Sequence, residues 1–137
     1  MPLLLLVALC GCSTVRPAKR YGNTQLESLK TAYIVWAAGL DRTIESYAKE
    51  ALETHGVKVS TGPRQEKPAD VDFYVECEPH WWWDLVVYLT RLDIRLIDNK
   101  TGQVFAIGQF HNSFFHTYPD PREKTIEVIN SIYSSTH

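Results

Sequence analysis

The stretch that decides the fold is Trp81-Trp82-Trp83-Asp84-Leu85-Val86-Val87-Tyr88-Leu89-Thr90-Arg91-Leu92-Asp93-Ile94-Arg95-Leu96-Ile97. Three consecutive tryptophans open it, a nearly continuous apolar run follows, and the last part alternates between apolar and charged residues. Alternation with a period of two predicts a β-strand with one buried and one solvated face. We therefore expect one long strand over residues 81–97, with neighbouring strands paired to it.

The flanking segments predict its partners. Residues 72–78 alternate in the same way, and Pro79 and His80 are expected to end that strand before the tryptophans. Residues 98–102 (Asp-Asn-Lys-Thr-Gly) predict a hairpin turn, because Gly102 can adopt a positive φ. Residues 103–115 are then expected to return as an antiparallel strand.

The remaining segments complete an α+β pattern. Residues 31–36 are β-branched and aromatic and predict the first strand, and residues 57–59 predict another short one. Pro119-Asp120-Pro121 is a helix start with a capping residue and an N-terminal proline. The expected order is β-α-β-β-β-β-α, a mostly antiparallel sheet with two helices packed mainly on one face. The first helix, residues 41–55, is predicted from apolar residues at helical spacing: Leu40, Ile44, Tyr47, Ala48, Ala51 and Leu52. The second helix has a similar stripe: Ile126, Ile129, Ile132 and Tyr133.

Composition limits the classes of function. The chain has 137 residues, which suits a single domain with its own core, and its net charge of −2 offers no basic surface for a nucleic acid. Three cysteines are too few for a disulfide framework, and their spacing matches no zinc site. The unusual feature is the clustering of three of the four tryptophans.

The N-terminus has the pattern of a secretory signal. Residues 1–11 are an apolar run ending in small residues, too short to span a bilayer as a helix. Leu9-Cys10-Gly11-Cys12-Ser13 resembles a bacterial lipobox, in which Cys12 becomes the lipidated N-terminus. We expect a signal peptide over residues 1–11, a lipidated and palmitate-bearing tether over residues 12–28, and a domain over residues 29–137. The expected signal peptide lacks the usual basic residue, which suggests a true start further upstream. Ser13 after the cysteine is similar to lipoproteins sent to the outer membrane.

Several segments together resemble a known kind of protein. They resemble small uncharacterised proteobacterial lipoproteins, whose layout is similar to the N-terminal domain of the Tol translocation protein. The layout is also similar to lipoproteins that activate penicillin-binding proteins and to ring-forming lipoproteins of curli and polysaccharide secretion. The resemblance implies an accessory domain facing the periplasm, and no particular reaction. The segments are Tyr33–Trp36, Glu53–Gly56, Thr61–Pro63, Pro68–Asp72, Trp83–Leu89 and Asp98–Val104.

Few residues suggest chemistry. His111 and His116 are five apart and would point to opposite faces of one strand, so we expect no metal site and no cofactor. Glu76, Glu78 and His80 lie near Asp84, but the parity of the two glutamates indicates a solvated face rather than paired catalytic acids. Cys77 shares parity with apolar residues, which predicts a buried, inert thiol.

The tryptophan cluster is open to two interpretations. Adjacent strand residues face opposite sides, so Trp81, Trp82 and Trp83 cannot all enter one core. They either cap the end of the sheet as a small core or form a contact surface, since tryptophan is frequent at binding hot spots and membrane interfaces. Residues 85–89 are apolar on both parities and are expected to be covered on both faces, for example by a helix and by another subunit.

We therefore expect a non-enzymatic envelope lipoprotein of accessory or structural type. It would be anchored in the membrane by its N-terminal lipid and would contact an envelope protein or further copies of itself. The alternatives are a glycan- or lipid-binding module that uses exposed tryptophans, and an envelope enzyme that uses Asp84, Glu78 or His80. The expected partner-binding residues are Trp81, Trp82, Trp83, Leu85, Val87 and Tyr88.

Overall fold

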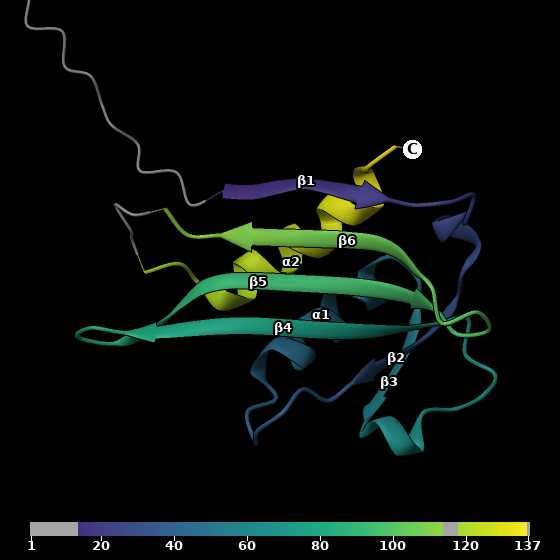
Figure 1. Cartoon of the computed structure of the whole chain (residues 1–137), viewed down its shortest axis with the longest axis horizontal. Coiled ribbons are helices and arrows are strands. Elements are labelled where there is room, and N and C mark those ends of the chain that lie inside the picture. Colours follow the sequence, from purple (N-terminus) through teal and green to yellow (C-terminus); the bar gives the residue numbers. More distant parts are fainter. Residues whose placement is uncertain (1–13, 114–117, 137) are drawn as a thin grey trace, which may run out of the picture.

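The computed structural model describes residues 14–113 and 118–136, in which a six-stranded sheet carries two α-helices. The elements are β1 (Thr14–Arg20), β2 (Thr31–Val35), α1 (Thr43–Thr54), β3 (Lys58–Gly62), β4 (Phe73–Trp83), β5 (Val87–Asp98), β6 (Val104–His111) and α2 (Pro121–Ser134) (Figure 1). Short 3-10 turns lie at Leu26–Ser28 and Arg64–Glu66. No helix of the described residues is long and apolar enough to cross a membrane.

The sheet has the strand order β1-β6-β5-β4-β2-β3. The first three pairings in that order are antiparallel, and β2 pairs in parallel with both β4 and β3. Because β2 and β3 are parallel neighbours joined through α1, this part of the chain is a β-α-β crossover. The expected α+β class, with a mixed and mostly antiparallel sheet, is confirmed.

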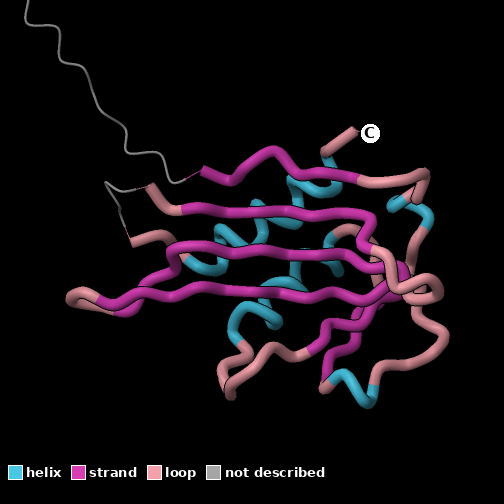
Figure 2. Tube along the Cα trace, in the orientation of Figure 1, coloured by secondary structure: helices cyan, strands magenta, loops and turns pink. Residues whose placement is uncertain are grey.

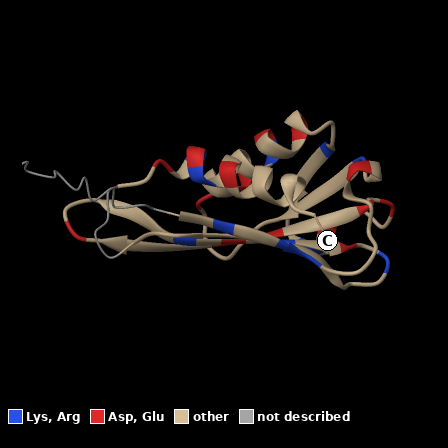
Figure 3. Ribbon diagram, turned by 90° about the horizontal axis from the view of Figure 1, so that it is seen from above, with Lys and Arg blue, Asp and Glu red and all other residues tan. Residues whose placement is uncertain are grey.

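Both helices lie on one face of the sheet and bury the core between them and the strands (Figure 3). Phe73, Val75 and Cys77 of β4 and the apolar parity of β5 point into this core, as their alternation predicts. At Gly108 of β6, an added Cβ would lie 2.7 Å from a methyl group of Val128, so only glycine lets α2 approach this closely. The two helices contact each other through His55 and Tyr133, whose rings stack at 3.8 Å.

The predicted turn and helix start are also present. The Asp98 carboxylate accepts hydrogen bonds from the amides of Lys100 and Thr101, which lower its pKa, and Gly102 has φ +70°. The Asp120 side chain accepts from the amides of Arg122 and Glu123 and caps α2.

Three expectations about the elements are wrong. Residues 14–20 are not part of a tether but form β1, paired with β6 at the edge of the sheet. Pro79 does not end β4, which continues to Trp83. The proline is tolerated within β4 because the pairing of β2 with β4 ends at Glu76, so β4 has an open edge at Pro79. Leu40 does not belong to the core stripe of α1, since it precedes the helix and its side chain is 97% exposed.

Asp72 joins the starts of β2 and β4, and this contact yields a pH-dependent prediction. Its carboxylate accepts hydrogen bonds from the amides of Lys30 (2.7 Å) and Thr31 (3.0 Å), and these bonds lower the pKa of Asp72 below 3.8. Because the pKa of Asp72 is lower in the folded state, the stabilisation by its carboxylate is complete at pH values above the ordinary pKa. This stabilisation is lost as the pH falls through the pKa of the folded state. Asp72→Asn should therefore reduce the free energy of unfolding by about 1 kcal/mol at pH 7, a low figure because the group is exposed.

Urea denaturation of both proteins at pH 7 and at pH 3 measures this effect. The difference between wild type and Asp72→Asn should shrink at pH 3. The exposed Asp70, two residues earlier, provides the control, and Asp70→Asn should have little effect at either pH. An Asp72→Asn difference that is the same at pH 3 as at pH 7 would contradict the role of the carboxylate.

Candidate functional site: an apolar hairpin beyond the sheet

The tryptophans lie on a β-hairpin that extends past the rest of the sheet (Figure 1). The pairing of β4 with β5 continues beyond His80–Arg91 through a bulge to Trp81–Leu89, Trp82–Tyr88 and Trp83–Val87. β6 pairs with β5 only as far as Arg91, opposite His111. The expectation of one strand over 81–97 is therefore wrong: the tryptophans end β4, residues 84–86 turn the chain, and β5 begins at Val87.

Most of the apolar side chains of the hairpin are exposed. Trp82 is 64% exposed, Trp83 67% and Leu85 88%, and Val86 and Val87 are exposed as well. Within one copy of the chain, residues 85–87 are exposed and only Tyr88 and Leu89 are buried, so the expected cover of residues 85–87 by a further subunit stays a prediction. We call residues 81–89 the apolar hairpin.

The hairpin has two distinct faces. Paired residues point to the same side and successive residues to opposite sides, so Trp82 shares one face with Tyr88, and Trp83 shares the other with Val87. Trp81 lies on the Trp83 face and is half-buried, packed against the core. A hollow on the hairpin is lined by Trp81, Trp82, Trp83 and Val87. The tryptophans thus combine the two interpretations: Trp81 extends the core, and the other two form a surface.

Asp84 and Tyr118 brace the turn of the hairpin. The Asp84 carboxylate accepts hydrogen bonds from the Leu85 and Val86 amides within the turn, and from the Tyr118 hydroxyl at 2.9 Å. This hydrogen bond to Asp84 raises the pKa of Tyr118. The Tyr118 ring packs edge-on against Tyr88 at 5.3 Å. Tyr88, expected among the partner-binding residues, is buried at 7% exposure, so it supports the surface from within.

The acidic residues near the hairpin are held in ion pairs. Glu76 contacts Arg64 and Arg95, and Glu78 contacts Arg95 at 3.3 Å and His80 at 3.4 Å. They lie on the sheet face opposite the helices, as their parity predicts. The structure pairs Glu78 with His80, whereas Asp84 bonds the turn amides and Tyr118, so the three side chains do not converge as one set.

The histidines and Cys77 show little sign of chemistry. Burial, together with the nearby Arg16 and Arg91, lowers the pKa of His111, and its Nε2 is enclosed without a hydrogen-bond partner. Burial also raises the pKa of the Cys77 thiol strongly, which disfavours the reactive thiolate. Among residues 14–113 and 118–136, no group of three or more His, Cys, Asp or Glu side chains could hold a metal ion. His116, Cys10 and Cys12 lie outside the described residues.

Sequence reasoning missed several exposed apolar residues, among them Val86 in the hairpin turn and Leu40 in the loop before α1. The signal for Val86 was Asp84, a turn-forming residue flanked by apolar residues on both sides. For Leu40 it was Asp41, whose side chain accepts a hydrogen bond from the Thr43 amide at 2.9 Å and so places the helix start after Leu40.

Comparison with known proteins identifies the fold but no family. No protein-family model and no curated protein matches the chain. Among solved structures, it is similar to the PelC dodecamer from Paraburkholderia phytofirmans, with a TM-score of 0.62 and 16% identity over 88% of this chain and 95% of that one. A single-substitution variant of that dodecamer gives a TM-score of 0.61 at 16% identity, over 88% and 96% of the two chains.

A PDZ domain protein from Parabacteroides distasonis is also similar, with a TM-score of 0.55 and 16% identity over 90% of this chain and 36% of that chain. At these identities the likeness concerns the fold alone. The chain therefore shares its fold with a protein that forms a dodecamer.

Proposed function

We propose that this protein is an accessory lipoprotein of the bacterial cell envelope that works as a structural component, without catalysis, by binding further copies of itself. Cys12 would carry the lipid, and the domain would face the periplasm, at the outer membrane. The lipobox-like sequence supports the anchor, and the PelC dodecamers support self-association as a property compatible with this fold.

The observation that carries the proposal is the apolar hairpin with both faces exposed. Trp82 occupies one face, and Trp83 and Val87 occupy the other. A hairpin whose two different faces are both apolar can contact one neighbour on each side. Such a head-to-tail interface closes into a ring, or continues as a filament, whereas a single face would give only a dimer. Exposed tryptophans are also the residues most often found at the energetic centre of protein interfaces.

Sedimentation velocity tests the proposal with the mature chain 12–137 carrying Cys12→Ser. All described strands, helices and core residues lie within residues 14–136, so this chain contains the whole fold. Wild type should form concentration-dependent oligomers. Trp82→Ser on one face, or Trp83→Ser with Val87→Ser on the other, should weaken association by about thirtyfold or more, since losing a tryptophan hot spot costs at least ~2 kcal/mol.

Mixing the two variants distinguishes a head-to-tail from a symmetric interface. Each variant keeps one intact face, so the two should be monomers alone and form a heterodimer together. Tyr21→Ser, which removes a 45%-exposed aromatic side chain elsewhere on the surface, is the matched control and should leave the oligomers unchanged. A wild-type protein that remains monomeric at every concentration contradicts the proposal.

A further inference from the structure

Most of the exposed apolar side chains lie at the end of the sheet from which the hairpin projects (Figure 1). Of the nine large apolar residues exposed in the described part of the chain, five belong to the apolar hairpin, and Tyr118 bonds to its turn. Tyr21, Trp36 and Leu40 lie elsewhere, since β2 ends opposite Glu76, four residues before the row from which the hairpin projects. The five are Trp82, Trp83, Leu85, Val86 and Val87.

The chain also enters the domain at this end. β1 begins with Thr14 opposite His111 of β6, and His111 lies opposite Arg91 of β5. Thr14 is therefore in the row of residues from which the hairpin starts to project (Figure 2). Because residues 14–20 are a strand and not a tether, only Ser13 separates Cys12 from the folded domain.

Cys12 and the hairpin tip can extend to different distances from the row of residues that contains Thr14 and Arg91. Two residues span at most ~7 Å, so the Cα of Cys12 lies within that distance of Thr14. From His80 to Trp83, β4 advances three residues, or ~10 Å at ~3.3 Å per residue, before the turn is added. The fourth residue that β5 uses over this stretch is taken up by the bulge. The tip of the hairpin therefore projects at least ~3 Å further from the sheet than the Cα of Cys12 can, and the turn adds to this difference. A lipid on Cys12 would bring this tip to the bilayer before the other described residues at this end of the domain.

The chemistry of the tip suits that position. Leu85 and Val86 are exposed at the turn, and Trp82 and Trp83 follow immediately behind them. Aliphatic side chains enter the boundary between head groups and acyl chains to ~5–10 Å, and tryptophan is enriched at the level of the head groups. Asp84 is the one acidic residue of the apolar hairpin, whose ribbon is otherwise tan in Figure 3. One of its carboxylate oxygens accepts hydrogen bonds from Tyr118 and the turn amides.

We propose that the tip of the apolar hairpin, Leu85 and Val86, inserts into the interfacial region of the lipid bilayer beside the lipid on Cys12. This inference rests on the lipoprotein part of the proposed function and adds a second attachment to the membrane. The tip is occupied by lipid, while the two faces that carry Trp82 and Trp83 lie behind it and remain available to neighbouring copies. The second contact fixes the orientation of the domain, which a single point of attachment does not.

Vesicle binding tests the proposal without the covalent lipid. The probe is the mature chain 12–137 carrying Cys12→Ser, mixed with vesicles of phosphatidylethanolamine and phosphatidylglycerol. It should sediment with the vesicles, and brominated acyl chains should quench its tryptophan fluorescence. Leu85→Glu with Val86→Glu should reduce partitioning by about tenfold or more, because two apolar side chains are replaced by charged ones. The Asp84 turn uses backbone amides, so this variant keeps its fold, which circular dichroism verifies.

The Tyr21→Ser control and the two measurements, vesicle binding and sedimentation, distinguish a failure of membrane insertion from a failure of self-association. Tyr21→Ser, at the other end of the molecule, should bind vesicles like wild type. The absence of vesicle binding, or an equal loss in Tyr21→Ser, would overturn the inference. So would a tip variant that binds vesicles normally but loses its oligomers, because the tip would then be a protein interface. Vesicle binding by a protein that sediments as a monomer would support the inference and contradict self-association.

Discussion

Replacing Arg20 by methionine is expected to lower the free energy of unfolding by about 2–4 kcal/mol, although Arg20 lies on the edge strand β1. Its side chain is only 5% exposed, and its guanidinium donates hydrogen bonds to the carbonyl oxygens of Ile132 and Tyr133 at 3.0 Å each. These carbonyls belong to the last turn of α2, where a helix has no internal donors for them and where its dipole favours a cation. Arg20 also forms an ion pair with Glu27 at 3.2 Å.

The expected loss is smaller than the sum of these bonds. Methionine fills a similar volume and removes a buried charge, so the variant recovers part of the cost of desolvating the guanidinium. The Tyr133 carbonyl loses this donor, and the Ile132 carbonyl keeps only the Ser135 hydroxyl at 2.7 Å, which accounts for most of the remaining effect. Urea denaturation followed by circular dichroism measures it.

Two variants control for charge and position. Arg20→Lys keeps the charge but not the planar array of donors, so its loss of stability should be intermediate. Lys19→Met changes the neighbouring exposed side chain and should shift the free energy of unfolding by no more than about 0.5 kcal/mol. If residues 14–20 were a tether, Arg20→Met would be as harmless as Lys19→Met, and that result would contradict the structure.

β1 was missed because its sequence carries almost no strand pattern. Only Val15 and Ala18 of this strand pack toward the core, and their spacing of three breaks the alternation. The structure explains the spacing, since the register between β1 and β6 shifts between Arg16 and Lys19. This irregular edge strand contains several basic residues and a proline, and its backbone groups are hydrogen-bonded to β6. Its own sequence gives no sign of that pairing.

The central strands were predictable because one face of each is buried and the other is wet. Phe73, Val75 and Cys77 alternate with exposed or half-exposed residues, and the structure places all three in the core. The same reasoning does not place the hairpin, where apolar residues of both parities predict cover on both faces without saying whether this chain or another subunit supplies it. Local sequence does not reveal where the helices end relative to the strands, and that boundary decides whether an apolar strand segment is core or surface.

The parity argument itself can be tested at Phe73 and Tyr74, which are neighbours on β4 and face opposite sides. Phe73 is completely buried and packs edge-on against Phe105, with the ring centroids 5.9 Å apart. Phe73→Ala should reduce the free energy of unfolding by about 3–5 kcal/mol, because the removed ring leaves a cavity that rigid neighbours cannot fill. Domains of this kind have roughly 5–15 kcal/mol in total, so this variant should be the least stable of those considered.

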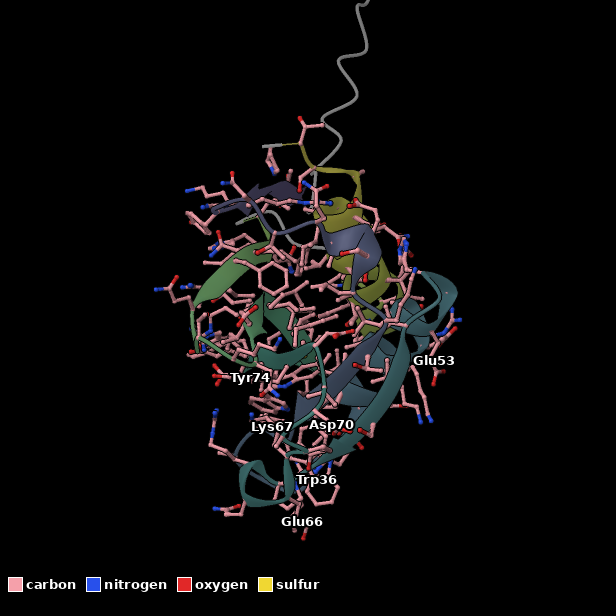
Figure 4. The ribbon with its side chains drawn as sticks, turned by 90° about the vertical axis from the view of Figure 1, so that its right-hand side faces the viewer. Trp36, Glu53, Glu66, Lys67, Asp70 and Tyr74 are labelled. Carbon is pink, nitrogen blue, oxygen red and sulfur yellow. The ribbon has the colours of Figure 1, made fainter. Side chains whose placement is uncertain are left out.

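Tyr74 is the matched control, since it has nearly the same side chain on the same strand. It lies on the outer face, half-buried, where the Lys67 ammonium is 4.7 Å from its ring (Figure 4). Tyr74→Ala loses this cation–π contact, worth about 0.5–1 kcal/mol at an exposed site, and some apolar contact, but leaves no internal cavity. Its loss of stability in urea denaturation should therefore be less than half that of Phe73→Ala. Equal losses would mean that the two faces of β4 are buried alike, and would contradict both the parity argument and a sheet with helices on one face only.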